Sequence, residues 1–478
     1  MTMDTLEHHQ KPRNVQGVGF NGYKQTRSPA EDAELTHVVP GTPCGELMRR
    51  YWQPVAMSSE LVPGRPLRVR ALGEDLVLFR DGSGDLGLLH AQCSHRRSSL
   101  EFGIVSEHGI RCCYHGWLFS VDGKILETPG EPATSRIRET VCHGAYPTHE
   151  YKGIIFAYMG PMEQKPPFLR FDTFEEPGVE MVPYAYEYPC NWLQTAENVV
   201  DTFHTVFLHT RVSGTQFSDA FGEMPIVVWR EMPNGAGIYL FNVRRVKQHI
   251  WVRMQESFRP NFSQTGDIWR DPGYETVFAR VGLSKWIVPI DNTHCRVIGW
   301  RYFADHLDLA RRGDRTKVGK GSIDFPGQTE NRTYDDKQTQ PGDFEAIVSQ
   351  GDINIHGREH LATTDVGVAM VRQKLRQAIK QVANGDPLPR PTLGADGLYA
   401  SYTQDTILHI PPGSGDDLKL RREIGEQVAD IVVQSEAIAS GARREAIRRM
   451  ILEKLGPSYP TIKLDLEHPA RPNTKELA

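Results

Sequence analysis

Short alternating segments separated by turns dominate the chain from about residue 55 to residue 160. Apolar and charged residues alternate over 67–71, and the wholly apolar run 76–79 is typical of a buried strand. The turn sequence Asp-Gly-Ser-Gly at 81–84 favours a hairpin that returns into a strand over 86–90. This stretch therefore predicts a compact all-β domain.

Helical periodicity precedes this stretch and returns after it, mixed with longer strands. We expect one helix over 44–52 and another at the start of the region 185–302. The expected strands of that region are 226–229, 237–241, 276–279 and 295–300. Residues 307–342 are charged and rich in Gly, Asp and Thr, which predicts an exposed loop.

Two helical segments are expected near the C-terminus. Thr364 or Asp365 can cap the first, which Asn384-Gly385 should end. Its apolar face comprises Val368, Val371, Leu375, Ile379 and Val382. The second covers 416–455 and is interrupted near Ser440-Gly441. Helices and antiparallel strands together predict an α+β protein with more than one core, as a length of 478 residues favours.

Composition narrows the class of protein. Apolar residues make up 39% and charged residues 24%, with a net charge of −5, which is ordinary for a soluble globular protein. No dense basic stretch predicts a nucleic-acid face, and no apolar run reaches membrane-spanning length. The polar first residues lack a signal-peptide core, and the seven cysteines form no disulfide framework. We therefore expect a cytoplasmic protein that binds neither nucleic acid nor membrane.

One Cys/His cluster carries the strongest chemical signal. Cys93 and His95 stand in one short segment, and Cys112 and His115 stand in another, with sixteen residues between His95 and Cys112. Two thiolates and two imidazoles suit either a tetrahedral zinc ion or a [2Fe-2S] cluster with two Cys on one iron and two His on the other. Zinc modules usually pair like ligands within one loop. The mixed pair in each loop favours the iron–sulfur cluster.

The spacing Cys-x-His, sixteen residues, Cys-x-x-His-Gly-Trp resembles the Rieske cluster motif. That resemblance implies that Cys93 and Cys112 bind as thiolates and that His95 and His115 bind as imidazoles. Cys113 departs from the family pattern and could replace Cys112 in a Cys-x-His reading. We assign Cys112 because the family spacing is Cys-x-x-His, and we treat Cys113 as a small hydrophobic residue.

A second group of ligand-type residues lies in the segment 191–209. Glu197, Asp201 and His204 are three and four residues apart, which places them on one face of a helix. His204 and His209 are five apart, about 140° around an ideal helix. They can therefore share one metal only if the helix ends or distorts between them. Taken alone, two such histidines are more often packing or surface residues.

The segment resembles the iron-binding helix of Rieske non-haem iron oxygenases. The resemblance implies that His204, His209 and a distant Asp form a 2-His-1-carboxylate site for Fe(II) with positions open for O2. Asp343, Asp352 and Asp365 are the candidates. We choose Asp343, because the segment that it begins is similar to the ligand-bearing segment of phthalate-dioxygenase-like oxygenases, whereas Asp365 has a helix to cap.

The resemblance also implies an assembly. It predicts a Rieske domain over 55–165 inserted in a helix-grip catalytic domain, with 1–54 as its N-terminal arm and helix and 166–478 as its main part. The family forms head-to-tail trimers in which the Asp three residues before the first iron-binding His connects one subunit's cluster to its neighbour's iron. Asp201 would hold that position, and a carboxylate partner also orients a ligating His. A solvated helix carboxylate is the alternative role for Asp201.

The implied function is that of a terminal oxygenase component. Gly17 to Gly22 matches a dinucleotide fingerprint by letter, but no strand precedes it and no helix follows. Electrons should therefore come from NADH through a separate reductase or ferredoxin. The phthalate-type resemblance, which includes 41–43 and 49–54, suggests ring hydroxylation or oxidative O-demethylation of an aromatic acid or aryl ether. Arg244, Arg245 and Arg253 are either carboxylate anchors or surface charges.

Three alternatives stay open at this point. The same machinery could oxidise an aliphatic alcohol or alkyl group. The chain could instead be a non-catalytic [2Fe-2S] electron-transfer protein, although His204, His209 and Asp343 argue against that role. It could also be a zinc protein, which would be colourless where a Rieske protein is red-brown.

Overall fold

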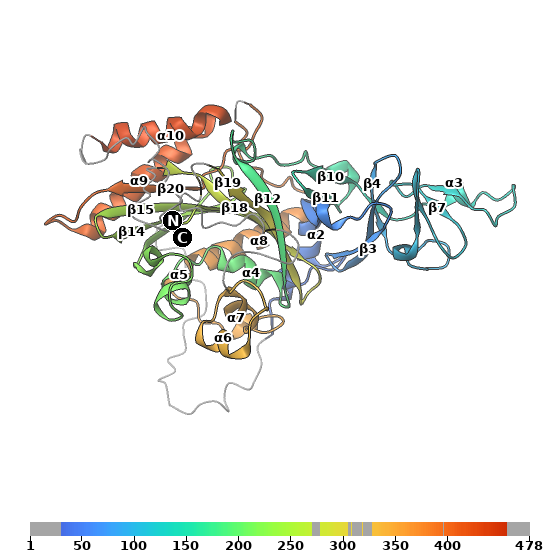
Figure 1. Cartoon of the computed structure of the whole chain (residues 1–478), viewed down its shortest axis with the longest axis horizontal. Coiled ribbons are helices and arrows are strands. Elements are labelled where there is room, and N and C mark those ends of the chain that lie inside the picture. The colour runs from blue at the N-terminus through green and yellow to red at the C-terminus, as the bar shows by residue number, and fades with distance from the viewer. Residues whose placement is uncertain are drawn as a thin grey trace, which may run out of the picture.

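The computed structural model describes residues 30–269, 278–304, 307, 318, 327–394 and 396–456. Figure 1 shows a larger body, which holds the long strands and most of the helices, and a narrower arm of short strands. The glycine motif at 17–22 lies outside the described residues. The expected α+β class is confirmed.

The arm consists of short antiparallel strands, as the alternating pattern predicted. One four-stranded sheet has the order β2 (Leu67–Ala71), β3 (Glu74–Arg80), β4 (Leu86–His90), β9 (Ala145–Tyr146). A second has the order β5 (Ile104–Ser106), β6 (Gly109–Arg111), β7 (Leu118–Phe119), β8 (Ile125–Glu127). The predicted 81–84 hairpin joins β3 to β4 in register from Arg80 and Leu86. Val77, Phe79, Leu89 and Phe119 are buried between the two sheets and form the core of the arm.

A three-stranded sheet follows the order β1 (Trp52–Met57), β11 (Ile154–Tyr158), β10 (Thr148–Tyr151). The predicted helix 44–52 is too long, because α2 spans Pro43–Arg49 and Trp52 already belongs to β1. Pro54 supplies the reason, since its ring would clash with the carbonyl of residue 50 in a continuing helix and it favours extended backbone at Gln53. The domain boundaries stay predictions, and β1 runs across the one expected between residues 54 and 55.

The body is built on one antiparallel sheet. Its main path is β12 (Glu180–Tyr188), β19 (Cys295–Phe303), β18 (Val281–Pro289), β16 (Phe262–Gly266), β15 (His249–Phe258), β14 (Gly237–Val246), β13 (Ile226–Glu231). β20 (Gln404–His409) pairs with β15 and with β17 (Phe278–Ala279). The strands expected at 226, 237 and 295 are confirmed and are longer than predicted. Of the fourth, residues 276 and 277 lie outside the described residues.

The expectation that the region 185–302 opens with a helix is wrong, since β12 precedes α4 (Trp192–Asn198). Tyr184, Tyr186 and Tyr188 alternate along β12 with a period of two residues, which is the strand pattern. β15, β16 and β18 were also not predicted. Their inward faces carry polar side chains as well as apolar ones, so the alternation that marks a half-buried strand is weak there.

Three long helices cover the sheet: α8 (Val366–Asn384), α9 (Asp417–Gln434) and α10 (Ser440–Leu455). The predicted apolar face of α8 is buried at Val368, Val371, Leu375 and Ile379, whereas Val382 is only partly buried. Gly385 ends this helix in the left-handed region at φ 76°. Asp365 occupies the N-cap position, but its carboxylate accepts from the N–H of Ala362 and not from the helix.

The predicted loop 307–342 is partly wrong. Of that range, the structure describes residues 307, 318 and 327–342, and it places α6 (Tyr334–Thr339) there, just before α7 (Asp343–Val348). Thr333 caps α6 by accepting from the N–H of Asp336, and two Asp residues stand in its first turn. These are helix-start signals that the overall composition obscured.

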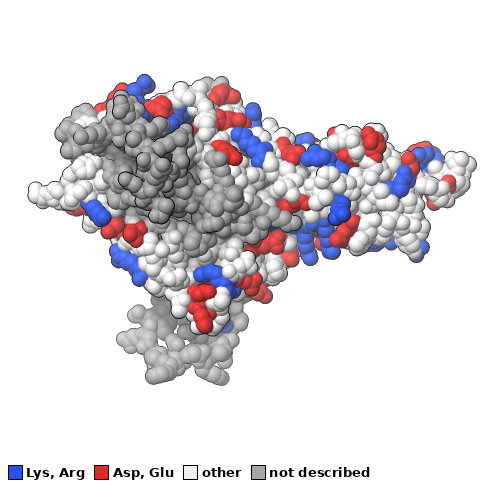
Figure 2. All heavy atoms as spheres, viewed as in Figure 1, with Lys and Arg blue, Asp and Glu red and all other residues white. Residues whose placement is uncertain are grey.

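Charge is mixed on the face of the molecule that Figure 2 presents. Figure 2 shows acidic and basic side chains interspersed over the face that it presents. Among the described residues, none of the helices has the length and apolar character needed to span a bilayer.

Candidate metal centres

The two Cys/His loops lie at one end of the arm and have matching backbone bonds. In each loop the cysteine N–H donates to a carbonyl five residues later, Cys93 to Ser98 and Cys112 to Trp117. In each, the cysteine carbonyl accepts from the N–H four residues later. Arg97 and Gly116, which supply those N–H groups, have φ of 64° and 74°. Two tight loops of the same shape therefore present one thiol and one imidazole each.

The side chains of the loops converge. The rings of His95 and His115 have centroids 4.5 Å apart, and His95 stacks on Trp117 at 4.6 Å. Cys93 and Cys112 are 1% and 2% exposed, whereas Cys113 is exposed. Burial and the neighbouring Cys112 thiol raise the pKa of Cys93 to about 11, although hydrogen bonds from backbone N–H groups act in the opposite sense. The contact between the buried thiols supports Cys112, rather than Cys113, as the partner of Cys93.

These residues fit a [2Fe-2S] cluster. Nδ1 of His95 is buried and has no hydrogen-bond partner in the described part of the chain. An unpartnered buried ring nitrogen is costly unless a metal accepts its lone pair. Two buried thiols beside two partly exposed imidazoles also match a cluster with chemically different irons. The assignment of the four ligands stays a prediction from the motif.

The second site forms where the chain departs from a regular helix. α4 ends at Asn198, and α5 (His204–Val206) passes directly into a π-helical turn at Phe207–Arg211. The Val212 N–H donates to the Phe207 carbonyl, the i to i+5 bond of such a turn. The extra residue in the turn brings His209 beneath His204, with ring centroids 5.1 Å apart. The distortion that the spacing required is therefore present.

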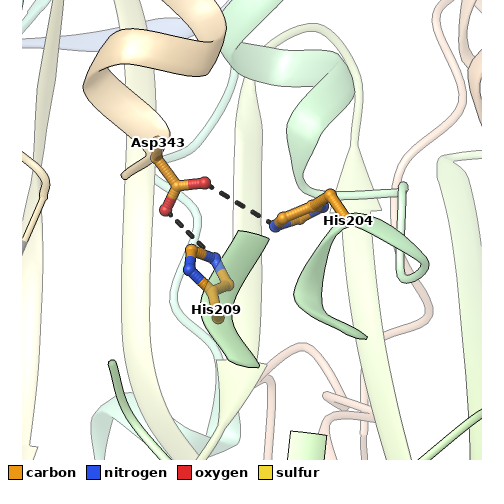
Figure 3. A group of neighbouring side chains, drawn as sticks. All are labelled: His204, His209 and Asp343. Atoms are coloured by element: carbon orange, nitrogen blue, oxygen red, sulfur yellow. Dashed lines mark ion pairs between the residues drawn. The ribbon is translucent and has the colours of Figure 1, made fainter. Parts of the chain in front are cut away.

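Asp343, the first residue of α7, completes a group of three. Its Oδ1 lies 3.7 Å from His204 Nε2, and its Oδ2 lies 3.4 Å from His209 Nε2. The three ligand atoms lie within 4.8 Å of one another, and Figure 3 shows the carboxylate turned toward both imidazoles. Asp352 and Asp365 are not part of this group: the backbone carbonyl of Asp352 accepts from the Asn191 N–H, and the Asp365 carboxylate accepts from the N–H of Ala362. Two Nε2 atoms and one carboxylate suit a facial Fe(II) site.

The pKa shifts of Asp343 and His204 indicate that this group favours a bound cation. Burial opposes ionisation of Asp343, but His209, His204 and a hydrogen bond from Gln328 outweigh it and hold its pKa well below the usual range. Burial likewise disfavours protonation of His204, yet Asp201 and Asp343 raise its pKa. A divalent cation would take the place of those protons on binding.

Three carboxamide side chains bond to the candidate ligands. The Nδ1 of His209 bonds to Gln216 Oε1 at 2.9 Å, and Gln216 in turn donates to the Pro341 carbonyl at 2.7 Å. Asn198 donates to Asp343 Oδ1 at 3.1 Å, and Gln328 donates to Oδ2. The bond to Gln216 leaves His209 Nε2 free to point at the metal, whereas His204 Nε2 also lies 3.4 Å from the Asn198 amide nitrogen. Gln216 and Gln328 were not predicted, since neither spacing nor residue type distinguished them from surface glutamines.

Asp201 and Glu197 have separate roles. Asp201 Oδ1 accepts from the N–H of Phe203 and of His204, and Oδ2 lies 3.6 Å from His204 Nδ1. The expectation that Glu197, Asp201 and His204 share one helix face is wrong, because α4 has ended before Asp201 starts the next turn. Glu197 forms a buried two-bond ion pair with Arg372 on α8.

A cavity opens beside Asp343 on the inner face of the sheet. The space in and around it, counted out to its open mouth, is about 740 Å³. Aromatic and ionic side chains line it, among them Tyr184, Tyr186, Phe217, Tyr302, Arg253, Asp267, Lys285 and Arg301. Aromatic side chains and the Asp343 carboxylate thus border the same cavity.

The surface-charge alternative is wrong for two of the three arginines. Arg244 is 0% exposed and donates to Thr205 and to the Glu223 carbonyl. Arg253 is 5% exposed, lines the cavity and pairs with Asp405 at 3.2 Å. Arg245 pairs with Asp417.

Comparison with known proteins identifies the class. Residues 51–142 match the Rieske [2Fe-2S] domain. The chain is 41% identical to the tert-butanol monooxygenase / tert-amyl alcohol desaturase oxygenase subunit of Aquincola tertiaricarbonis, over 92% of this chain and 97% of that relative. It is 39% identical to the phenoxybenzoate dioxygenase subunit alpha of Ectopseudomonas oleovorans, over 74% and 87%. The crystal structure of dicamba monooxygenase bound to dicamba shares the fold, with a TM-score of 0.53, 17% identity and coverage of 70% and 98%.

The chain belongs to the oxygenase subunits of the Rieske non-haem iron oxygenases. It is therefore an oxygenase of a multicomponent system that uses a Rieske cluster, a non-haem iron and O2. The expected family and enzyme class are confirmed, and the electron-carrier and zinc-protein alternatives are set aside.

Proposed function

We propose that this subunit hydroxylates or oxidatively O-demethylates an aromatic acid or aryl ether. The observation that carries the proposal is the cavity beside Asp343, lined by Tyr184, Tyr186 and Phe217 together with cationic side chains. Aromatic walls suit a ring, and cations suit a carboxylate. The phenoxybenzoate dioxygenase and the 5,5'-dehydrodivanillate O-demethylase among the relatives act on compounds of that kind.

The candidate ligands form two separate groups, one for the cluster and one for the iron. Cys93, His95, Cys112 and His115 would hold the cluster, and His204, His209 and Asp343 would hold the iron. When bound, the two groups supply the electrons that activate O2. The cavity walls exclude water from the oxidising centre and hold the substrate against it. NADH would feed the cluster through a separate reductase or ferredoxin, and the seven unpaired cysteines favour the reducing cytoplasm.

Electron transfer would run between subunits of a homotrimer, through Asp201. Figure 1 places the cluster end of the arm, beside β7, far from α4 and α5. A partner subunit's cluster is therefore a better donor than the chain's own. Asp201 already contacts the ring of His204 and keeps a side chain 32% exposed, so one face of it is open to a neighbour.

Asp201→Asn is expected to keep both metals but to slow reduction of the iron site by about 100-fold. An amide still caps the turn before His204, but it loses the charge that orients the two histidines. Stopped-flow single turnover of the pre-reduced enzyme measures the effect, with iron analysis and the cluster spectrum as checks. Asp352→Asn, on a loop away from the cavity, is the matched control. A wild-type single-turnover rate would rule out the bridge.

Oxidation of an aliphatic alcohol is the second candidate. It is favoured by one observation, the 41% identity with the tert-butanol monooxygenase subunit over nearly its whole length. The same iron site would serve, and only the fit of the cavity would differ.

A substrate panel separates the two candidates. With a reductase supplied, we expect O2 uptake and product from 3-phenoxybenzoate, 4-methoxybenzoate or vanillate, with formaldehyde released from the methoxylated acids. tert-Butanol and tert-amyl alcohol should give at least about 10-fold lower kcat/KM, since they leave most of the cavity unfilled. Turnover of the alcohols alone would establish the second candidate instead.

A further inference from the structure

Lys285 is the feature of the cavity that the metal site does not explain. It stands on β18, faces the same cavity as Asp343 and is only partly exposed. Among the described residues, no hydrogen bond or ion pair reaches its ammonium group. Burial lowers its pKa, and the Asp343 carboxylate acts in the opposite sense. A partly buried ammonium without a partner is unfavourable unless a ligand supplies the opposite charge.

The sheet register sets Lys285 in one row with an aromatic residue of the cavity wall. Gly299 on β19 pairs with Lys285 on one side and with Tyr184 on the other, so the three positions form one row on the cavity face. A Cβ on Gly299 would lie 1.9 Å from the Ser284 carbonyl oxygen and 2.7 Å from Lys285 Cα. The glycine therefore lets the backbones of β18 and β19 approach closely, and no side chain of β19 stands between Lys285 and Tyr184 in this row.

Tyr184 offers a second polar group in the same row. Its side chain is 2% exposed, and its hydroxyl has no hydrogen-bond partner among the described residues. By contrast, Arg253 is held by Asp405 and by the carbonyls of Gly266 and Asp267. Lys285 and Tyr184 thus combine a cation with a hydroxyl donor, and neither is committed to a described residue of the protein.

The charge of the cavity points in the same direction. Its lining has three cationic side chains, Arg253, Lys285 and Arg301, and two acidic ones, Asp267 and Asp343. Asp405, outside the lining, balances Arg253, and a divalent metal on Asp343 would add positive charge to the cavity. A negatively charged group on the substrate would be attracted to the cavity, and a neutral one would leave the lysine unpaired.

We propose that Lys285, with the hydroxyl of Tyr184, binds the carboxylate of an aromatic acid and so determines the substrate specificity of this oxygenase. This inference rests on the proposed function and narrows it to aromatic acids. The carboxylate would lie between the ammonium group of Lys285 and the hydroxyl of Tyr184, and the ring would extend past Tyr186 and Phe217 toward the metal ligands.

Binding of two matched probes to the anaerobic holoenzyme tests this role. The probes are 3-phenoxybenzoate and 3-phenoxybenzyl alcohol, which differ in charge and share the ring system, and calorimetry gives both Kd values. Lys285→Met should raise the Kd of the acid by about 10- to 100-fold, which is the effect of losing a charged hydrogen bond. It should change the alcohol by less than about 3-fold, and Lys285→Arg should restore much of the affinity for the acid.

Two further variants complete the design. Lys419→Met, which removes an exposed lysine on α9, is the matched control and should leave both Kd values unchanged. Tyr184→Phe keeps the ring and should raise the Kd of the acid by about 3- to 10-fold, because one hydrogen bond is lost. It keeps the proposal testable if Lys285→Met does not fold.

Three results would overturn the inference. One is equal weakening of both probes by Lys285→Met, because the lysine would then be structural. Another is unchanged acid binding in both Lys285→Met and Tyr184→Phe. The third is failure of the wild type to bind the acid. In the first two cases, turnover of aromatic compounds by the wild type would leave the proposed function intact. Turnover of tert-butanol alone by the wild type would overturn both this inference and the proposed function.

Discussion

Asp343→Ala should abolish substrate turnover, by more than about 100-fold, while the cluster spectrum stays intact. Removing a ligating carboxylate should cost more than the 10- to 100-fold typical of residues that only orient a ligand. Both imidazoles would remain, but the anion that neutralises the metal would be gone. Iron analysis should fall from three irons per chain to two, and the visible absorption should match that of the wild type.

Asp352→Ala supplies the comparison for this experiment. Asp352 was a candidate ligand on sequence, but its carbonyl, which the substitution keeps, makes its bond to Asn191. This variant should retain three irons and wild-type turnover. Activity in Asp343→Ala together with loss of activity in Asp352→Ala would show that the carboxylate had been assigned to the wrong segment.

Cys112→Ser should yield a protein without the red-brown colour and without reductase-driven turnover. The thiol is 2% exposed and lies against Cys93, so a hydroxyl in its place would leave one iron of the cluster with a single thiolate. Cys113→Ser, one residue away and exposed, should keep both colour and turnover. Absorption and EPR spectra of the reduced proteins measure the difference. The reverse outcome would assign the cluster to Cys113.

The Asp343→Ala and Cys112→Ser proteins, combined in one assembly, also test whether electrons pass between subunits. Coexpressed in one assembly, an Asp343→Ala subunit offers an intact cluster and a Cys112→Ser subunit offers an intact iron site. Activity should return in mixed assemblies if electrons cross between subunits, and it should stay absent if each chain serves only itself. Mixing the separately purified proteins without exchange of subunits is the control.

Sequence located the two groups of ligand-type residues better than it predicted the elements that carry them. Cys93, His95, Cys112 and His115 stand in two short loops, so their spacing alone placed them together. His204, His209 and Asp343 needed the family resemblance, because Asp343 comes from a distant helix and no local pattern links it to the histidines. The structure brings both groups together, while their metal-binding roles remain predictions.

The errors had local physical causes. Pro54 ended a helix that the apolar spacing had continued, and Asp201 started a new turn where one helix face was expected. Nothing in the sequence marked Lys285 as a cavity residue, because a lysine in a strand is usually a surface charge. Its position became visible only when the register set it beside Gly299 and Asp343.

The π-helical turn at Phe207–Arg211 has a consequence for how such sites are found and altered. Each residue added to a helix rotates all later side chains of that helix by about 100°. Deleting one residue between His204 and His209 would leave an ordinary helix with the two histidines four apart on one face, and every later residue of the helix would be rotated by about 100°. The five-residue spacing seen here meets at one site only because of the π turn, so searches that require regular helical spacing would overlook it.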